Sequence, residues 1–576
     1  MPRVVFGSRE TLGWELALDE PLAVVEAWRI DEVLPVLNFA EARAQAGAYV
    51  AVMISYEAAP AFDSALSVHP SGEFPLVWAA SFKSPANIGT QAHRTFTNGS
   101  WTPKVTRNEY ESAVTRIREL VAAGDTYQVN YSFPLTASFN GDAYAWYREL
   151  CEAQRAPYST YLDLGRYRVL SLSPELFFER RGARVLTRPM KGTARRGRWV
   201  TEDEVLKEQL QNSPKDRAEN IMIVDLLRSD LGKVSVPGSV HVSSLLDAER
   251  YETVWQLTST VESTLRTRTR LVDLLSALFP CGSVTGAPKV RTMQIIRELE
   301  PFPRGAYTGA IGLLRPGGDC IFNVAIRTVV IDTNTGLATF SVGGGVTIDS
   351  TAEGEYEECL VKSRFLQSKP AEFELFESML LADGEVFLLE RHLERLKNSA
   401  AFFGITFREE IYAHLERVVA EHPKGRWKIR LFLSRKSFTT DVTPAPAPEK
   451  VCVALADTPI DSSDRFLFHK TTKRDCYAGR DDVIFWNERG EVTESSIANI
   501  VVSIDDELFT PPVSSGLLAG TFREQLLTEG KIRERVITIE ELRNARQFFL
   551  INSVRKWMEA ELVVEQDLSA SAAKLL

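Results

Sequence analysis

The sequence predicts an α+β chain that folds as two domains. Three observations support this prediction: the length of 576 residues, the mixture of strand-like and helix-like segments, and one clear break in that pattern. A chain of this length exceeds what one hydrophobic core usually serves. The break is SKPAEF at 368–373. We therefore expect an N-terminal domain of residues 1–367, with its core at about 105–365, and a C-terminal domain of residues 371–576.

Periodicity predicts the main elements of the N-terminal domain. Apolar residues at helical spacing predict a helix over 108–123, which Gly124 ends. The segment 126–139 alternates like a strand. Residues 336–349 (GLATFSVGGGVTID) predict a strand that runs into three glycines, and 352–367 predict a charged helix.

The pattern restarts after the break. Residues 374–390 (ELFESMLLADGEVFLLE) predict strands joined by an Asp-Gly turn, and 391–404 predict a helix that ends on glycine. The short run PAPAPE at 444–449 predicts a semi-rigid loop. No internal repeat is evident.

Composition and charge favour an enzyme that acts on small molecules. The chain is 44% hydrophobic and 25% charged, as folded proteins usually are. A net charge of -10 without a long basic run argues against nucleic acid or a membrane as the main partner. The N-terminus lacks a signal-peptide pattern, and no apolar run could span a bilayer. Six scattered cysteines without a CxxC pair indicate neither disulfides nor zinc, so we expect a cytoplasmic protein.

Two segments place reactive side chains near glycine or on a helix. In 171–197, Glu175 and Lys191 flank a predicted hairpin, and Gly192 would let a ligand approach the backbone. In 216–232, an apolar helical stripe is interleaved with Glu219, Asp225 and Asp230. Taken alone, Lys191 is better interpreted as an ordinary surface lysine, and the acidic residues as a solvated helix face.

Two further segments suggest anion and metal binding. The loop GSVTGAPK leads into a helix at Pro288, where free N–H groups favour an anion. Glu355, Glu358 and Lys362 share one face of the predicted helix at 352–367. Paired carboxylates suit Mg²⁺. The alternative interpretation of this face is an ordinary surface ion pair.

All four segments occur in the order and wording of one family. The stretch 105–365 resembles the chorismate-utilizing enzymes, which include anthranilate, aminodeoxychorismate, isochorismate and salicylate synthases. This resemblance implies a β-sandwich/helix fold of the anthranilate synthase component I type. Lys191 lies in TRPMKGT, where anthranilate synthases typically have alanine and aminodeoxychorismate synthase component I has lysine.

The resemblance implies a role for each matching position. Lys191 is the expected nucleophile at ring C2 of chorismate, and Glu175 the acid for the departing C4 hydroxyl. Ammonia then displaces the lysine and gives 4-amino-4-deoxychorismate. Mg²⁺ would be held by Glu219, Glu355 and Glu358. The residues expected to bind the substrate are Gln128, Thr285, Tyr307, Arg327, Gly343, Gly344, Gly345 and Lys362.

Three departures qualify these roles. Many relatives have HLVS where this chain has Gln256-Leu257-Thr258-Ser259, so the proton-relay role of that histidine does not transfer. Gln128 stands where isochorismate and salicylate synthases have a lysine that activates water, which counts against those activities. The chain also lacks a glutaminase signature. The resemblance therefore implies a separate glutamine amidotransferase subunit that supplies ammonia from glutamine.

The C-terminal domain resembles the fold-type IV pyridoxal phosphate enzymes. The matching segments are HLERLKNSA, FHKTTKRDCY, GEVTESSIANIVV and SSGLLAGTFREQLL. Lys470 falls at the Schiff-base position, followed by Arg474, and Glu494 matches the carboxylate that keeps the pyridinium nitrogen protonated. The phosphate is expected at Arg395 and at the turn formed by Gly520, Thr521 and Phe522.

Fusion of the two domains suggests the overall reaction. The product of the first domain is the substrate of aminodeoxychorismate lyase, a member of the second family. We therefore expect both transferase and lyase activity, with 4-aminobenzoate for folate biosynthesis and pyruvate as products. The alternative is an anthranilate synthase-type large subunit fused to a branched-chain or D-amino acid aminotransferase. Fold-type IV domains are usually dimeric, so a homodimer through the C-terminal domain is expected.

Overall fold

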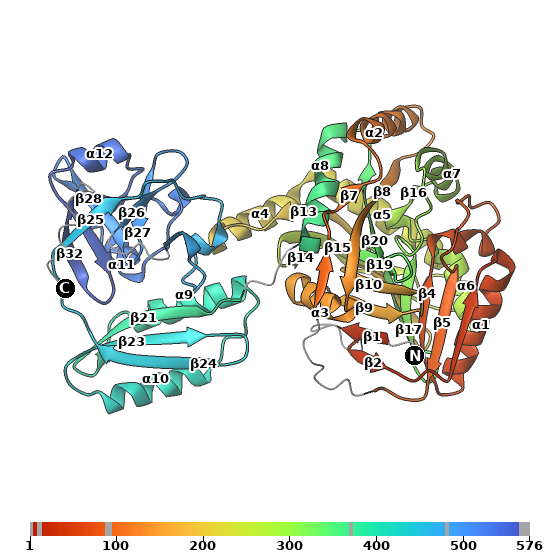
Figure 1. Cartoon of the computed structure of the whole chain (residues 1–576), viewed down its shortest axis with the longest axis horizontal. Coiled ribbons are helices and arrows are strands. Elements are labelled where there is room, and N and C mark those ends of the chain that lie inside the picture. Colours follow the sequence, from red (N-terminus) through yellow and green to blue (C-terminus); the bar gives the residue numbers. More distant parts are fainter. Residues whose placement is uncertain (1–3, 8–13, 87–94, 368–371, 478–482, 564–576) are drawn as a thin grey trace. The chain divides into compact units, whose positions relative to one another are not determined.

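The structure is a computed structural model that describes residues 4–7, 14–86, 95–367, 372–477 and 483–563. The chain divides into two compact units. Unit 1 comprises Met1–Arg195 and Lys207–Ala371, and unit 2 comprises Arg196–Leu206 and Glu372–Leu576. Helices and sheets are mixed in both units (Figure 1), which confirms the predicted α+β class. Unit 2 therefore includes one segment, Arg196–Leu206, that lies inside the range expected for the N-terminal domain.

Unit 1 contains two antiparallel ten-stranded sheets. The first sheet consists, in spatial order, of β16 (Gly286–Ala287), β8 (Gln128–Gly141), β20 (Leu337–Val346), β19 (Thr328–Asp332), β10 (Tyr167–Ser173), β9 (Tyr158–Asp163), β1 (Val4–Gly7) and β2 (Leu16–Leu18), with β6 (Phe96–Asn98) and β7 (Thr102–Pro103) beside β8. The second consists of β13 (Met190–Arg195), β15 (Val254–Thr264), β12 (Arg184–Arg188), β11 (Leu176–Arg181), β18 (Cys320–Val324), β17 (Ala310–Leu314), β4 (Tyr49–Ile54), β5 (Val77–Phe82) and β3 (Ala23–Ala27), with β14 (His241–Arg250) beside β15.

Helices cover the outer faces of these sheets. They are α1 (Ile30–Gln45), α2 (Arg107–Ala122), α3 (Ala143–Gln154), α5 (Pro214–Gly232), α6 (Leu271–Leu278), α7 (Lys289–Leu299) and α8 (Ala352–Ser363), with short 3₁₀ turns η1 (Tyr56–Ala61), η2 (Gly282–Val284) and η3 (Arg364–Gln367). In Figure 1, α1 lies along β5 and α6 lies beside α1, whereas α2, α7 and α8 lie near β8 and β20. Helix α4 (Val200–Asn212) begins in the segment that belongs to unit 2.

Alternation along single strands explains this layered packing. On β4, Val50, Val52 and Ile54 join the core with α1, α5 and α6. Ala51 and Met53, which point the other way, join a core built from the inner faces of both sheets. Both faces of β4 are therefore buried, so its sequence reads as a continuous apolar run.

The predicted helix at 108–123 appears as α2. The hydroxyl of Thr106 accepts a hydrogen bond from the Glu109 amide, and the Glu109 carboxylate accepts one from the Thr106 amide. This capping box fixes where the helix begins. Its apolar stripe, which includes Tyr110, Val114 and Ile117, is buried against the first sheet.

Unit 2 has a small helix-covered sheet and a barrel. The small sheet consists of β22 (Glu385–Val386), β21 (Leu375–Ala382), β23 (Arg426–Leu433) and β24 (Phe438–Pro444). Helices α9 (Leu389–Phe402) and α10 (Glu410–Glu421) pack on its apolar face. The Asp383-Gly384 turn joins β21 to β22, as predicted from the sequence.

The larger sheet closes on itself. Its order is β27 (Val492–Ser495), β26 (Val483–Trp486), β25 (Val451–Leu455), β32 (Lys556–Leu562), β31 (Phe548–Asn552), β28 (Asn499–Ile504), β29 (Glu507–Thr510) and β30 (Arg533–Glu534). An additional pairing of β27 with β28 completes a ring of strands. Helices α11 (Thr521–Thr528) and α12 (Ile539–Asn544) and the turns η4 (Arg465–Leu467), η5 (Asp475–Tyr477) and η6 (Val513–Ser515) connect these strands.

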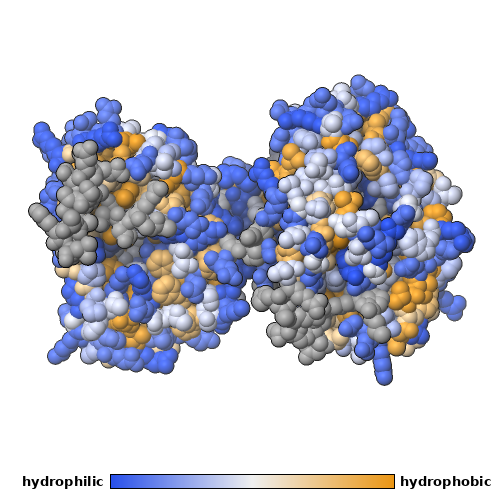
Figure 2. Space-filling model, viewed as in Figure 1, coloured by the Kyte–Doolittle hydropathy of each residue, from blue (hydrophilic) through white to orange (hydrophobic). Residues whose placement is uncertain are grey.

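The surface is mainly polar. On the face shown in Figure 2, hydrophilic residues predominate and hydrophobic residues occur in separate groups. Among the helices in the described ranges, none has the length and apolar character that spanning a bilayer requires.

Candidate active sites

Lys191 lies on β13, where two neighbouring elements hold its backbone. The side-chain amide of Asn220, on α5, donates a hydrogen bond to the Lys191 carbonyl at 3.2 Å. Gln256, on β15, donates to the Gly192 carbonyl at 3.0 Å and accepts from the Thr193 hydroxyl at 3.0 Å. Gln256 is the residue that stands where many relatives have histidine. In this chain its two hydrogen bonds hold β13, the strand that carries Lys191.

Three strands of unit 1 meet at the Lys191 ammonium group. A methyl group built on Gly345 of β20 would lie 2.5 Å from Nε2 of Gln128 and 3.1 Å from Nζ of Lys191. Gln128, on β8, is fully buried, and within the described residues neither polar atom of its side chain has a hydrogen-bond partner. Because buried amides are normally paired, Gln128 is placed to bind a ligand beside Lys191.

Glu175 is a buried carboxyl held by one serine. The hydroxyl of Ser283, in η2, donates a hydrogen bond to Oε1 of Glu175 at 2.6 Å. Burial raises the pKa of Glu175 to about 7, against the opposing effects of Ser283 and the Lys191 charge. Burial also lowers the pKa of Lys191, which the charges of Glu219 and Glu175 partly offset. The pair therefore combines a carboxyl that keeps its proton up to about pH 7 with an amine that loses its proton more readily than usual.

The glycine run leaves room for charged side chains of α8. A methyl group on Gly344 would lie 2.6 Å from Oε2 of Glu355. Lys362 donates a hydrogen bond to the Gly343 carbonyl at 2.9 Å and forms an ion pair with Glu358 at 2.7 Å. The predicted face of α8 therefore lies against β20, and a side chain at Gly344 would displace Glu355.

The carboxylates of Glu219, Glu355 and Glu358 offer only oxygen donors, which is the type of ligand that Mg²⁺ prefers. Burial raises the pKa of Glu219 and of Glu355, and in both cases the charge of Glu358 adds to the increase. A divalent cation would relieve this repulsion. Within the described ranges, no three His, Cys, Asp or Glu side chains are gathered into a preformed metal site. Mg²⁺ commonly takes one or two carboxylates and completes its shell with water and substrate oxygens, so these glutamates remain suitable ligands.

The other two acidic residues singled out on α5, Asp225 and Asp230, form ion pairs. Asp230 is paired with Lys289 at 3.1 Å and with Lys233 at 2.7 Å. Asp225 is paired with Arg228 at 2.8 Å. Among the three acidic residues singled out on this helix, only Glu219 interacts with Lys191.

The remaining substrate-binding candidates lie around β8 and Glu175. The carbonyl of Thr285 accepts a hydrogen bond from the Asn130 amide at 2.7 Å, and Tyr307 is buried beside the Asn130 side chain. Arg327 adopts a positive φ of 49° and donates to Gln154 at 3.2 Å. The contacts described for Arg327 do not join it directly to Lys191.

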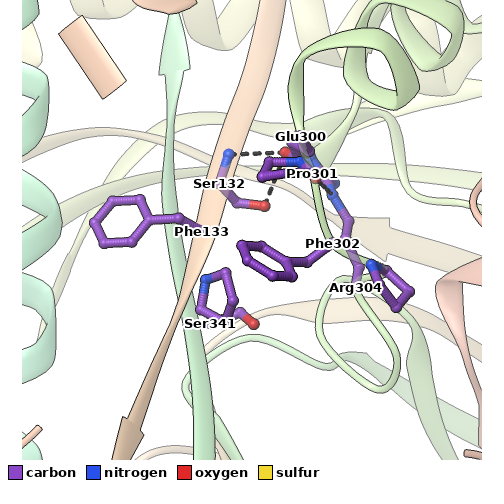
Figure 3. Close-up of a pocket in the computed structure, with 9 residues that line it drawn as sticks. Ser132, Phe133, Glu300, Pro301, Phe302, Arg304 and Ser341 are labelled. Atoms are coloured by element: carbon purple, nitrogen blue, oxygen red, sulfur yellow. Dashed lines mark hydrogen bonds and ion pairs between the residues drawn. The ribbon is translucent and has the colours of Figure 1, made fainter. Parts of the chain in front are cut away.

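A buried ion pair fixes the frame of this site. In Figure 3, the backbone amide and hydroxyl of Ser132 both point to the carboxylate of Glu300, at 2.8 and 2.9 Å. Arg304 pairs with the same carboxylate at 2.6 Å and also donates to the carbonyls of Asn130 and Val284, at 2.6 and 3.0 Å. Arg304 thereby joins β8, η2 and the loop that carries Tyr307. Sequence reasoning missed Arg304, because its bond to the Asn130 carbonyl, 174 residues away in the chain, is visible only in the structure.

Lys470 is the centre of the second candidate site. Burial and the charge of Arg395 lower the pKa of Lys470 to about 7, which Glu377 opposes. The Lys470 ammonium lies 4.7 Å from the centroid of the Phe376 ring, and the Lys470 carbonyl accepts a hydrogen bond from the Phe376 amide. A half-buried lysine that is neutral near pH 7 can form a covalent bond to a carbonyl group.

Glu494 is the acceptor at the centre of a buried network. It accepts hydrogen bonds from Arg474 at 2.7 Å, Tyr477 at 3.0 Å and Asn499 at 3.1 Å. Burial raises the pKa of Glu494, and Arg474 opposes this. The charges of Glu494 and Arg474 both affect Lys470, so the predicted residues are brought together.

Arg395 lies beside the turn that precedes α11. It forms a two-point ion pair with Glu377 at 2.7 and 2.9 Å and donates to the Ala519 carbonyl at 2.9 Å. His392 contacts Glu377 at 2.7 Å and the Thr521 hydroxyl at 3.2 Å. Burial opposes ionisation of Glu377, but Arg395 and His392 lower its pKa to about 2.

These features fit pyridoxal phosphate. Gly520 precedes the first residue of α11, and a side chain there would collide with the Asn499 amide. The turn therefore requires glycine at the start of the helix, where free backbone N–H groups favour a phosphate. Glu377 and His392, which sequence reasoning missed, hold Arg395 and Thr521 in place.

Comparison with known proteins gives a family for each of the two parts of the chain. Residues 25–368 match the chorismate binding enzyme family, and residues 374–563 match the amino-transferase class IV family. Aminodeoxychorismate synthase component 1 of Klebsiella aerogenes is 44% identical over 46% of this chain and 59% of its own length. Anthranilate synthase component 1 of Aquifex aeolicus is 39% identical over 46% of this chain and 54% of its own length. The chain thus spans less than two thirds of each of these relatives.

A solved structure shows the same fold for unit 1. Anthranilate synthase component I from Streptococcus pneumoniae aligns with a TM-score of 0.54 and 24% identity, over 61% of this chain and 91% of that one. The predicted anthranilate synthase component I-like fold and the class IV aminotransferase-like domain are therefore confirmed. Because the first match covers well over half of the 576 residues, the chain belongs to the chorismate binding enzyme family.

Proposed function

We propose that unit 1 converts chorismate and ammonia to 4-amino-4-deoxychorismate, and that unit 2 removes pyruvate from this product to give 4-aminobenzoate. The observation that supports this most directly is that Lys191, Gln128 and Gly345 lie together, and that among the described residues the buried amide of Gln128 has no hydrogen-bond partner. The relatives named aminodeoxychorismate synthase component 1 support the same reading of the first reaction.

The side chains of unit 1 supply a nucleophile and an acid. The neutral amine of Lys191 forms a bond to ring C2, while Glu175 gives its proton to the C4 hydroxyl, which departs as water. Ammonia then bonds to C4, and the C2–nitrogen bond to Lys191 breaks. The pKa of Glu175, about 7, keeps a proton available for the first step. Mg²⁺ held by Glu219, Glu355 and Glu358 would neutralise the ring carboxylate.

The side chains of unit 2 move one proton. Pyridoxal phosphate, when bound, supplies an electron sink. Lys470 takes the proton from C4 of the substrate and returns it to the enolpyruvyl carbon as pyruvate leaves. Its pKa of about 7 suits both steps. Arg395 and the turn before α11 would hold the phosphate of the cofactor, and Glu494 would keep its ring nitrogen protonated.

Ammonia would come from a separate glutaminase. The name "component 1" of the relatives implies a partner component, and we propose that this partner is a glutamine amidotransferase. We also propose that the protein forms a homodimer through unit 2, as fold-type IV domains usually do, and that it is cytoplasmic.

The decisive experiment incubates the purified protein with chorismate, Mg²⁺, ammonium and pyridoxal phosphate. We expect 4-aminobenzoate and pyruvate, identified by chromatography and mass. Anthranilate as the product would overturn the assignment of unit 1. Accumulated aminodeoxychorismate would support unit 1 and favour an aminotransferase in unit 2. Lys191→Ala, with Lys207→Ala as the matched control, tests the nucleophile, since unchanged aminodeoxychorismate output would refute that role.

A further inference from the structure

Unit 2 is built from two separate parts of the sequence. Besides Glu372–Leu576, it contains Arg196–Leu206, which we call the 196–206 segment. This segment lies inside the range that matches the chorismate binding enzyme family. Its contacts within unit 2 converge on the residues that precede Lys470.

The 196–206 segment has a rigid internal structure. Arg196 and Asp203 form a two-point ion pair with distances of 2.6 to 3.0 Å, and both side chains are less than 10% exposed. The backbone amide of Gly197 also donates to Asp203, at 2.8 Å. Buried, multiply bonded ion pairs hold one geometry, because leaving either charge unpaired is costly. The segment therefore presents Arg198 and Trp199 in fixed positions.

Arg198 and Trp199 pack on Phe468. The rings of Trp199 and Phe468 lie 4.9 Å apart at 30° to each other, and the Arg198 guanidinium lies 4.7 Å from Trp199 and 5.4 Å from Phe468. Arg198 also donates a hydrogen bond to the Ser462 carbonyl at 3.0 Å. Aromatic and cation–π contacts of this kind stabilise a defined arrangement of the three side chains.

The segment also reaches His469, through the contact of Arg196 with Phe402. Its guanidinium lies 4.6 Å from the centroid of the Phe402 ring. Phe402 in turn contacts the buried ring of His469, with centroids 4.3 Å apart, and Ser399 contacts Nδ1 of His469 at 2.9 Å. The segment thus holds both residues before Lys470.

We infer that the 196–206 segment positions Lys470 by holding Phe468 and His469, so that cofactor binding in unit 2 depends on residues from within the chorismate-binding sequence. The Lys470 backbone is fixed on one side by Phe376 and on the other by this packing. Trp199 and His469 are positioning residues that act through Lys470. The inference rests on the proposed binding of pyridoxal phosphate at Lys470.

The test uses the full chain with Trp199→Ala. We expect cofactor affinity to fall on the order of tenfold, the effect of losing one aromatic partner and its buried area. The pH midpoint of the bound cofactor's visible absorbance should also shift, which a purely structural role elsewhere would not cause. Trp199→Phe should restore both, and Val205→Ala, at an exposed position of the same segment, should change neither.

The outcomes separate this inference from the proposed function. If the unaltered chain binds no pyridoxal phosphate, the proposed function of unit 2 is wrong. If it binds the cofactor and Trp199→Ala matches it in affinity and pH midpoint, the role of the segment is refuted. If Trp199→Ala loses its far-ultraviolet circular dichroism, Arg198→Met decides instead, because it removes the contacts to Ser462 and Phe468 but keeps a long side chain. Unchanged cofactor binding in that variant would equally overturn the inference.

Discussion

Glu175 should set the upper pH limit of the first reaction. Burial raises its pKa to about 7, so the proton that the leaving hydroxyl needs is present below pH 7 and lost above it. We expect kcat for aminodeoxychorismate formation to fall as pH rises through about 7. Glu175→Gln should lower kcat roughly 10²–10⁴-fold, as loss of a general acid typically does.

The control for Glu175 is a carboxyl-to-amide change at the surface. Glu353, on α8, has a side chain that is 80% exposed, and Glu353→Gln should leave both kcat and its pH profile unchanged. A pH profile of Glu175→Gln that still falls near pH 7 would show that another group supplies the proton.

Lys470 should govern how fast the cofactor attaches. The pKa of its amine is lowered to about 7, so the neutral form that bonds to an aldehyde increases as pH rises through that value. We expect the rate at which cofactor-free protein gains visible absorbance with pyridoxal phosphate to rise between pH 6 and 8, about one unit on either side of that pKa. Lys470→Ala should show no such absorbance.

Lys473 provides the matched control for this experiment. It lies three residues further on and contacts the Phe466 ring at 4.9 Å, so Lys473→Ala removes a lysine without touching the candidate site. If the visible absorbance survives in Lys470→Ala and disappears in Lys473→Ala, the cofactor attaches to Lys473 and not to Lys470.

At the level of elements, the glycine run of β20 is the feature most sensitive to substitution. Gly345→Ala would place a methyl group 2.5 Å from Gln128 and 3.1 Å from Lys191. We expect KM for chorismate to rise and the first activity to fall at least tenfold, because the methyl would displace the ends of the Gln128 and Lys191 side chains. The melting temperature should change little, since the nearest atoms belong to side chains and not to the backbone. The measurement is steady-state kinetics together with thermal unfolding.

Gly232→Ala is the control for that substitution. Gly232 ends α5, and a methyl group there would meet no atom within 4 Å. It should be neutral or slightly stabilising, since alanine favours helix over glycine. Equal effects of the two substitutions would show that Gly345 matters for folding and not for the pocket.

Local sequence patterns predicted helices and turns better than they predicted contacts between distant side chains. The apolar stripe of α2 and the Asp-Gly turn of unit 2 were readable, because both depend on neighbouring residues. The acidic stripe of α5 was ambiguous, because the pairing of Asp230 with Lys289 depends on tertiary structure. The resemblance selected Lys191 and Glu175, but Gln256 could be assigned only once β15 was seen beside β13.

At the level of the whole molecule, the sequence break located the boundary near residue 370. It did not show that an earlier stretch, the 196–206 segment, also belongs to unit 2. The 196–206 segment belongs to unit 2 through contacts with Phe402, Ser462 and Phe468. Such long-range contacts leave no periodic signal in the sequence. A family boundary near residue 370 therefore does not by itself define a separable C-terminal enzyme.

The two reactions should be separable by mutation in the full chain. Lys470→Ala should accumulate aminodeoxychorismate, and Lys191→Ala should convert added aminodeoxychorismate but not chorismate. We expect a mixture of the two variants to make 4-aminobenzoate from chorismate after a lag, because each reaction uses side chains of one unit and the intermediate is a small, water-soluble anion. Chromatography of timed samples measures both species. If each variant keeps its own activity but the mixture yields no 4-aminobenzoate, the intermediate passes within a single chain and is not released.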